Sequence, residues 1–236
     1  MNVGYKFRVF RDLFFTKGGW KRVIGVGLRN TLIIAVLGLA IGVLIGTLIA
    51  IVRVMPKYKR LPRVLNGICS VYVGFFRGTP LVVQLLIAYY VLFPLFGWGI
   101  SSLATCVIIF GMNSGAYVSE IMRSGIQSVD AGQLEAGRAV GLPYWAAMLK
   151  IVIPQAVKNI LPTLGNEFII LIKDTSVASF VAAVDIYKCF TEIGNVHYEY
   201  LMPYLAMAFL YWVLVMIISY GVKCLERRLK RSERHA

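Results

Sequence analysis

The sequence predicts an all-α integral membrane protein, and three observations support this fold class: composition, charge content and the length of its apolar runs. Of the 236 residues, 58% are hydrophobic and the mean hydropathy is +0.73, whereas soluble domains contain about 45–50% apolar residues. Only 15% of the residues are charged, against about 25% in a soluble domain. Several runs approach or exceed the length of roughly 20 apolar residues that a spanning helix needs, and together they predict about five transmembrane helices.

The net charge of +14 comes from 25 Lys and Arg against 11 Asp and Glu. In a soluble protein such an excess would suggest nucleic-acid binding. Here the charges lie mainly between the apolar runs, so we expect them to orient the chain in a lipid membrane. We expect no nucleic-acid partner. The four cysteines lack metal-ligand spacing, so no metal site is expected either.

The first predicted span is Asn30–Val52, which carries no charge. Gly38, Gly42 and Gly46 recur every four residues, so they share one face of the helix. This spacing favours close packing against another helix over glycines that merely face lipid.

A basic segment, Arg53–Arg63, follows the first span and contains no acid. Pro56 and Pro62 are expected to stop regular helix there. Because Lys and Arg accumulate in cytoplasmic loops, the segment predicts the cytoplasmic side.

A long stretch without Asp, Glu, Lys or Arg, Gly78–Ser119, suits two spans. We place the second span at Leu81–Phe96 and the third at Ser102–Met122, divided by the turn-rich Phe96–Ser101. Val64–Phe76 is also apolar, and we expect it to begin the second span, deep in the membrane or at its surface.

The next segment, Glu120–Lys158, is too polar to span and predicts a sizeable loop. A fourth apolar segment, Ile160–Val184, is interrupted by Glu167, Lys173 and Asp174. Leu201–Val222 is uncharged and predicts the last span, which is followed by a basic tail.

Five spans place the two termini on opposite sides, with the loop and the tail in the cytoplasm and the N-terminus outside. The outer loops are then Phe96–Ser102 and Asp185–Tyr200. The N-terminal arm is nevertheless basic, which the positive-inside rule does not favour. Either the arm lies along the outer surface as an amphipathic helix, or the number of spans is wrong by one. The helical spacing of Phe7, Phe10, Phe14 and Phe15 favours the surface helix.

The polar loop predicts a helix–turn–helix knob. Gln133–Val140 suits a short helix with acids near its start, Gly141 permits a left-handed stop, and Pro143 can begin the next helix. The same residues resemble the EAA motif of the membrane subunits of ATP-binding-cassette importers: Glu-Ala-Ala, three residues, Gly, nine residues, Ile, any residue, Leu, Pro. Gly137 replaces the second Ala and Ile153 replaces Leu. The positions that match are Glu135, Ala136, Gly141, Ile151 and Pro154.

A second stretch, Phe76–Gln84, reads FRGTPLVVQ and is similar to a stretch of the polar amino acid importers. The resemblance implies the type I importer permease fold in a bacterial cell membrane. It divides the chain into an amphipathic arm (1–27), a transmembrane domain (28–226) and a basic cytoplasmic tail (227–236). The knob would then be the coupling helix, formed by Glu135, Ala136, Gly137, Gly141, Leu142, Pro143, Ile151 and Pro154.

The resemblance also implies the partners. They are cytoplasmic ATPase subunits, a second permease that is identical or related, an external amino-acid-binding protein and a polar amino acid substrate. ATP and Mg would be bound by the ATPase, so no cofactor is expected on this chain.

Ionisable residues within a membrane are costly, and so they are candidates for the substrate pathway. Arg77 lies beside a break expected at Gly78-Thr79-Pro80, where Pro80 starts a helix whose free N–H groups face the break. Arg77 is therefore expected to bind the carboxylate of an amino acid, and Glu167 its ammonium group. Alternatively, these two residues pair with each other, or Lys173 pairs with an acid, to hold the bundle together. Polar residues on neighbouring spans, Ser114 included, either line the path or bond between helices. The full candidate set is Arg77, Gly78, Thr79, Pro80, Gln84, Asn113, Tyr117, Glu120, Glu167, Lys173 and Asp174.

An enzyme is not expected. The sequence has no P-loop, HExxH or GxSxG motif, and its two histidines lie in an outer loop and at the C-terminus. No catalytic residue is therefore assigned. An ion-coupled secondary amino acid transporter without an ATPase is the main alternative, but such transporters often contain inverted repeats. None is evident here, and that class would leave the knob unexplained.

Overall fold

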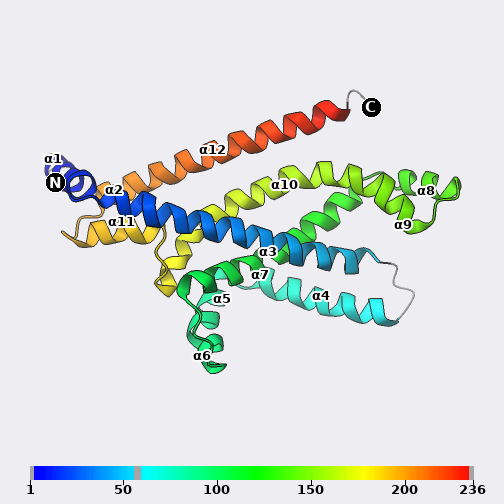
Figure 1. The fold of residues 1–236 in the computed structure, drawn as a ribbon, viewed down its shortest axis with the longest axis horizontal. Coiled ribbons are helices and arrows are strands. Elements are labelled where there is room, and N and C mark those ends of the chain that lie inside the picture. Colours follow the sequence, from blue (N-terminus) through cyan, green and yellow to red (C-terminus); the bar gives the residue numbers. More distant parts are fainter. Residues whose placement is uncertain (1–2, 56–59, 234–236) are drawn as a thin grey trace.

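The computed structural model describes residues 3–55 and 60–233, and within these residues it is a helical bundle without β-strands. Its long helices run roughly along one axis, with the N-terminal arm and α11 at one end and α8 and α9 at the other (Figure 1). Pro56, Lys57 and Lys59 of the predicted basic segment lie outside the described residues.

The first long helix begins earlier than the sequence predicts. α2 (Gly19–Arg22), a π-helical segment and α3 (Arg29–Val54) form one continuous helix over Gly19–Val54. No proline interrupts residues 19–30, and the break instead falls at Gly18, whose φ of 76° lies in the left-handed region.

The predicted glycine face of this helix packs against α7 (Ser102–Gln127). A Cβ atom on Gly42 would lie 2.7 Å from Ser114 Oγ, and one on Gly46 would lie 2.6 Å from Val118 Cγ1. α7 has its own close approaches, because Gly111 and Gly115 face Ile41 and Ile45 on α3. The two backbones approach closely because small residues lie on both sides.

The second span is broken. α4 (Arg60–Gly78) meets the segment Leu81–Leu95, which contains α5 (Leu81–Ile87) and α6 (Phe93–Leu95), at 105°. We call the junction at Thr79 and Pro80 the elbow. The prediction that Pro62 stops helix is wrong. Pro62 lies in the first turn of α4, where a backbone N–H has no partner within the helix, so the proline removes no helical hydrogen bond.

The polar loop is shorter than predicted, because helix continues from both sides. α7 runs to Gln127, and α10 (Ile153–Asp174) already begins before Lys158. Between them lie α8 (Ala131–Ala139) and α9 (Tyr144–Ala147). Pro162 does not end α10, which tolerates it within the helix.

Three helices in the described chain are long and apolar enough to cross a membrane: Gly19–Val54, Ser102–Gln127 and Leu201–Leu229. The bent pair at the elbow makes a fourth span if it is counted as one. α10 is the fifth long helix of the bundle and contacts α3, α7 and α12 (Leu201–Glu233). Its polar and charged residues lower its hydropathy, so length and composition alone do not identify it as a span. The predicted tail from residue 227 continues α12.

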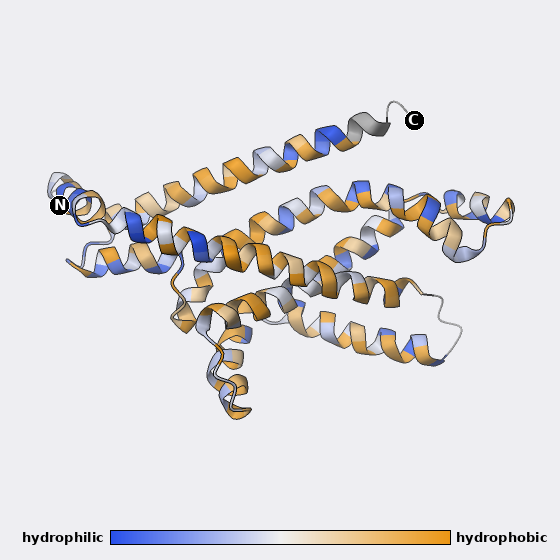
Figure 2. Ribbon diagram, in the orientation of Figure 1, coloured by the Kyte–Doolittle hydropathy of each residue, from blue (hydrophilic) through white to orange (hydrophobic). Residues whose placement is uncertain are grey.

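The N-terminal arm lies at the end of the bundle opposite α8 and α9. α1 (Val3–Arg11) is seen end-on in Figure 1 and therefore crosses the bundle axis. It lies beside α11 (Ile186–Asn195), which occupies the predicted outer loop. Hydropathy follows the same axis, with apolar residues along the middle of α3, α7 and α12 and polar residues toward the ends (Figure 2).

Candidate functional site

A polar cavity of about 290 Å³ lies where α7 and α10 meet the elbow. Six of the predicted pathway residues line it, together with Leu81, Ile170 and Leu171. The structure thus brings together residues that are far apart in the sequence: Thr79, Pro80, Asn113, Tyr117, Glu167 and Asp174.

The elbow exists because Pro80 has no N–H to continue the helix and is held in an extended conformation. The carbonyl groups that the break leaves open are bound by side-chain amides. Gln84 Nε2 donates to Phe76 O at 2.9 Å and to Thr79 O at 3.0 Å. Asn113 Nδ2 donates to Phe76 O at 3.2 Å and to Gln84 Oε1 at 3.0 Å. Gln84 and Asn113 therefore fix the shape of the elbow in addition to lining cavities.

Two carboxylates face the cavity from one side of α10. Glu167 and Asp174 are seven residues apart, so they share a helix face about two turns apart. Glu167 is 6% exposed, and its Oε1 accepts a hydrogen bond from Ser114 Oγ at 3.1 Å. Gly42 contacts Ser114 from α3, so the glycine packing supports this part of the site.

The basic candidates lie at the margin of the cavity. The Arg77 guanidinium stacks on the ring of Tyr117, 5.4 Å from its centre, and Tyr117 lines the cavity. Among the described residues, no ion pair joins Arg77 or Lys173 to Glu167 or Asp174. Lys173 and Gly78 are exposed and do not line the cavity.

Glu120 lies outside the cavity, nearer the end of the bundle that carries α8. It forms ion pairs with Arg53 of α3 and with Arg123, whose Nη2 is 2.7 Å from Glu120 Oε2. The sequence had placed Glu120 on the substrate pathway, and the structure instead joins it to the end of α3.

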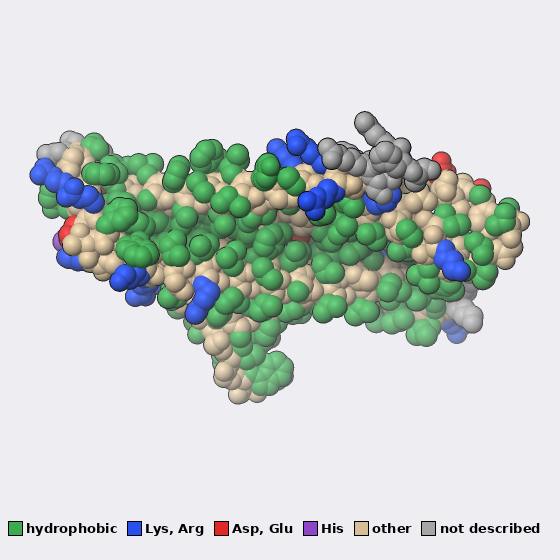
Figure 3. Space-filling view, turned by 45° about the horizontal axis from the view of Figure 1, so that its top comes forward, with side chains coloured by type: hydrophobic (Ala, Val, Ile, Leu, Met, Phe, Trp, Pro, Cys, Tyr) green, Lys and Arg blue, Asp and Glu red, His purple; other side chains and the backbone are tan. Residues whose placement is uncertain are grey.

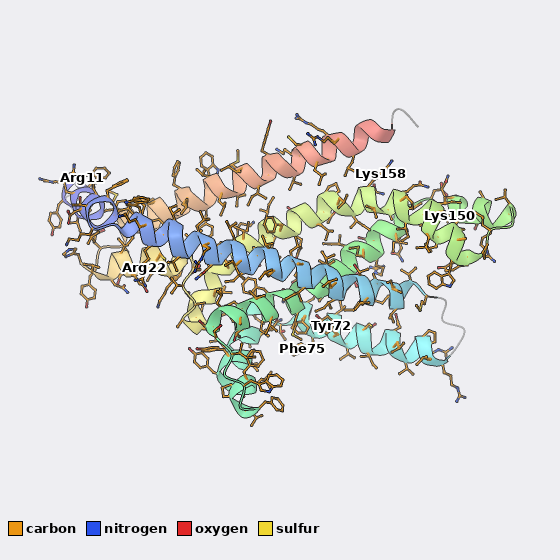
Figure 4. All side chains as sticks on the ribbon, in the orientation of Figure 1. Arg11, Arg22, Tyr72, Phe75, Lys150 and Lys158 are labelled. Carbon is orange, nitrogen blue, oxygen red and sulfur yellow. The ribbon has the colours of Figure 1, made fainter. Side chains whose placement is uncertain are left out.

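A larger cavity of about 420 Å³ lies in the angle between α4, α5–α6 and α7. Its lining is largely apolar and includes Phe75 and Met112, with polar groups from Thr79, Gln84 and the indole of Trp98. Phe75 lies on α4, as does Tyr72 one turn earlier (Figure 4). A zwitterion would lose its hydration there without replacement, so we assign the polar cavity, although smaller, as the candidate site.

The predicted knob forms as expected. Asp130 caps α8 by accepting from Gly132 N at 2.7 Å. α8 ends at Ala139 and is followed by Gly141, whose φ is +91°, with hydrogen bonds from Gly141 N to Arg138 O and from Leu142 N to Gly137 O. This pattern of two bonds is the Schellman motif, which requires a residue such as glycine at the left-handed position.

The knob is compact inside and exposed outside. Gly137 is buried, and a Cβ there would lie 2.7 Å from Ile151 Cδ1, which ties α8 to the segment that enters α10. Val140 is 80% exposed and Trp145 51% exposed. Glu135, Gly141 and Pro143 are exposed as well, whereas Ile151 and Leu142 are half-buried. An exposed apolar patch at the tip of a polar loop is typical of a docking surface.

Long apolar helices around a polar cavity define a multi-pass membrane protein of the transporter class. Residues 39–231 match the family described as the binding-protein-dependent transport system inner membrane component. The chain belongs to this family, and its fold is the all-α type I permease fold.

Relatives cover nearly the whole chain. The arginine transport system permease protein ArtQ of Bacillus subtilis is 37% identical over 207 residues, which cover 88% of this chain and 92% of ArtQ. The L-cystine transport system permease protein TcyB of the same organism is 37% identical over 210 residues, 89% of this chain and 87% of TcyB.

Solved structures support the fold. The crystal structure of an amino acid ABC transporter with histidines has a TM-score of 0.81 and 39% identity, covering 88% of this chain and 94% of that chain. The inward-facing MetNI methionine ABC transporter has a TM-score of 0.67 at 18% identity, covering 92% and 96%, and supports the fold alone.

Proposed function

We propose that this chain is the permease subunit of an ATP-driven importer of polar amino acids and forms half of its translocation pathway. The observation that carries the proposal is the knob, an exposed α8–Gly141–α9 unit joined directly to the helix that carries the cavity carboxylates. ArtQ, TcyB and the amino acid ABC transporter of known structure support amino acids as the substrate class.

The knob end of the bundle is assigned to the cytoplasm. Lys150 and Lys158 lie at this end (Figure 4), as do Arg53 and the basic end of α12. The positive-inside rule favours this orientation, which places the N-terminal arm outside. Lys6 pairs with Glu199 and Arg22 pairs with Glu192, both in the predicted outer loop. These ion pairs neutralise part of the positive charge at the arm, so the arm conflicts less with the positive-inside rule.

In the polar cavity, the carboxylates of Glu167 and Asp174 suit the ammonium group of an amino acid. Arg77, at the margin above Tyr117, suits its carboxylate. Thr79, Asn113 and Tyr117 also line the cavity and present hydrogen-bonding side chains to a polar substrate. Selection among amino acids is assigned largely to the external binding protein.

Coupling follows from the continuity of α10. Its first residue, Ile153, adjoins the knob, and Glu167 lies 14 residues further along the same helix, about 21 Å away along the axis. A displacement of the knob by an ATPase therefore moves the cavity carboxylates relative to the elbow. This motion provides alternating access in a pair of permeases, identical or related, with ATP and Mg held by the ATPase.

The test is a mild-detergent purification of the tagged full-length chain from its native membranes, with mass spectrometry of the proteins that co-elute. We expect an ATPase of the cassette type and a second permease, either a further copy or a relative. Glu135→Ala or Gly141→Val should lose the ATPase, because one removes an exposed acid of α8 and the other strains the left-handed turn. Gln133→Ala, which alters another exposed residue of α8, should retain it.

A second measurement distinguishes an ATP-driven importer from an ion-coupled secondary transporter. The purified complex in liposomes should move amino acids only when ATP is supplied on the knob side. Uptake by the chain alone, driven by an ion gradient without ATP, would establish an ion-coupled secondary transporter and refute the proposal.

A further inference from the structure

The N-terminal arm has one face that the protein covers and one face that it does not. On the covered face, Phe14 stacks on Phe10 and on Phe190 of α11, with ring centres 5.2 and 6.0 Å apart. Lys6 Nζ lies 2.5 Å from Glu199 Oε2. The arm is therefore anchored to α11 and to the start of α12.

The opposite face alternates aromatic and basic side chains. Phe7, Arg11 and Phe15 are four residues apart and align on one side, with Arg8 adjacent. Phe7 is 54% exposed and Phe15 is 63% exposed. We call Phe7, Arg8, Arg11 and Phe15 the arm face. Figure 4 shows Arg11 at the extreme end of the molecule.

The charge of this region is strongly positive. In the space-filling view, Lys and Arg gather at the end of the molecule that carries the arm (Figure 3). Asp12 is the only acid between residues 3 and 29, and it lies 3.7 Å from Lys17. Arg8 Nε donates to Gly4 O within the helix. Among the described residues, no ion pair joins Arg8 or Arg11 to an acid.

The arm lies at the depth expected for a membrane surface. It crosses the bundle axis at the start of the first long helix and beside the start of α12 (Figure 1). Aromatic residues of the kind found at membrane interfaces surround this level: Trp20 beneath the Lys21 ammonium, and the ring contacts of Tyr187, Tyr200 and Tyr204.

We propose that the arm face binds the headgroups of anionic phospholipids in the adjacent leaflet, with Arg8 and Arg11 on the phosphates and Phe7 and Phe15 in the glycerol and upper acyl region. Arg binds phosphate through a planar fork of donors, and exposed aromatic side chains suit the boundary between headgroups and acyl chains. An acidic face of a soluble binding protein would satisfy the arginines, but it would leave two exposed phenylalanines without an apolar partner. The proposal does not depend on what the chain transports.

The test uses the purified full chain, with any subunits that co-elute, titrated with phosphatidylglycerol or phosphatidylcholine and followed by native mass spectrometry. We expect the first phosphatidylglycerol to bind about tenfold more tightly than phosphatidylcholine, with a preference that weakens as salt rises. Arg8→Gln with Arg11→Gln should abolish the preference. Lys223→Gln with Arg227→Gln, which removes the same charge at the other end, should leave it unchanged.

The two phenylalanines supply a second readout. Phe7→Ser with Phe15→Ser should weaken both lipids while preserving the ratio between them. Two results would overturn the proposal. One is a preference that survives the Arg8 and Arg11 changes. The other is an equal loss in the Lys223 and Arg227 control, which would mean that net charge alone attracts the lipid. If the arginine variant keeps its lipid preference and loses stimulation by the external binding protein, the arm face is a protein docking site instead.

Discussion

The contact between α3 and α7 predicts a graded response to single methyl groups. A Cβ on Gly46 would lie 2.6 Å from Val118 Cγ1 and 2.8 Å from Ser119 N. An ordinary contact begins at 3.4 Å, so Gly46→Ala requires a separation of roughly 0.8 Å, which forfeits about a quarter to a half of each affected van der Waals contact. Because one of the atoms is backbone, a rotation of Val118 cannot relieve it.

The expected cost of this overpacking is about 1–3 kcal/mol. Gly74→Ala is the matched control, since nothing lies within 4 Å of a Cβ there and both glycines are helical. Alanine favours helix over glycine by about 1 kcal/mol in both variants. For a chain of this size, each kcal/mol corresponds to about 2–4 °C in Tm, so Gly46→Ala should melt roughly 2–12 °C below Gly74→Ala.

The assay is heating of the full chain in detergent, followed by the folded fraction on size-exclusion chromatography. Gly38→Ala, with its nearest contact at 3.2 Å, should fall between the other two variants. Gly46→Ala melting within about 1 °C of Gly74→Ala would refute the close approach of α3 and α7.

Three further predictions concern polar groups. In a double-mutant cycle of Arg53→Gln and Glu120→Gln, the two losses in Tm should not add, since either change breaks the same partly buried pair; additive losses would show that the pair contributes nothing. Gln84→Met keeps the side-chain length but leaves Thr79 O without its amide donor. It should cost about 1–3 kcal/mol, seen as a lower Tm in detergent, and an unchanged Tm would contradict the role of the amide. Burial raises the pKa of Asp185 to about 6 from 3.8, although the N–H groups of Tyr187 and Lys188 donate to its carboxylate. The folded chain therefore binds a proton at Asp185 more readily than the unfolded chain does. As pH rises from about 4 to about 6, the free energy of unfolding should fall, and above about pH 6 the full loss is roughly 3 kcal/mol. Asp185→Asn keeps the N-cap, so its Tm advantage over the wild type should be larger at pH 7.5 than at pH 4.5, and an equal difference at both pH values would exclude the titration.

The sequence predicts the parts of this fold that depend on local chemistry. The first span, the third span and the knob follow from apolar length, from an acid before α8 and from glycine where φ is positive. The position of the elbow follows from Pro80, but its angle of 105° could not be predicted, because the angle depends on side chains that are distant in sequence. A proline at residue 80 indicates a break, but only Asn113 of α7 and Gln84 of α5, acting together on Phe76 O, fix the direction of the chain after it.

The N-terminal arm shows a second limit of sequence patterns. The helical spacing of its four phenylalanines correctly indicates that the arm is helical. Spacing alone does not separate Phe10 and Phe14, which pack on the protein, from Phe7 and Phe15, which remain exposed. That division depends on the position of α11, which forms within the predicted outer loop Asp185–Tyr200.

Glu120 and Glu167 are chemically alike, but helix packing gives them different partners: Glu120 pairs with Arg53, whereas Glu167 accepts a hydrogen bond from Ser114. α3 and α7 run parallel, and their contacts keep one register, with Gly38 against Phe110, Gly42 against Ser114 and Gly46 against Val118. Continuing this register by two turns brings Arg53 level with the last turns of α7, and because helical side chains point toward the N-terminus, its guanidinium reaches Glu120. Arg53 thereby neutralises Glu120, and the glycine packing that joins the two helices sets the position of Arg53. Glu167 receives only a neutral hydroxyl from that interface, through Ser114, and pairs with no cation among the described residues, as the proposed ammonium site requires.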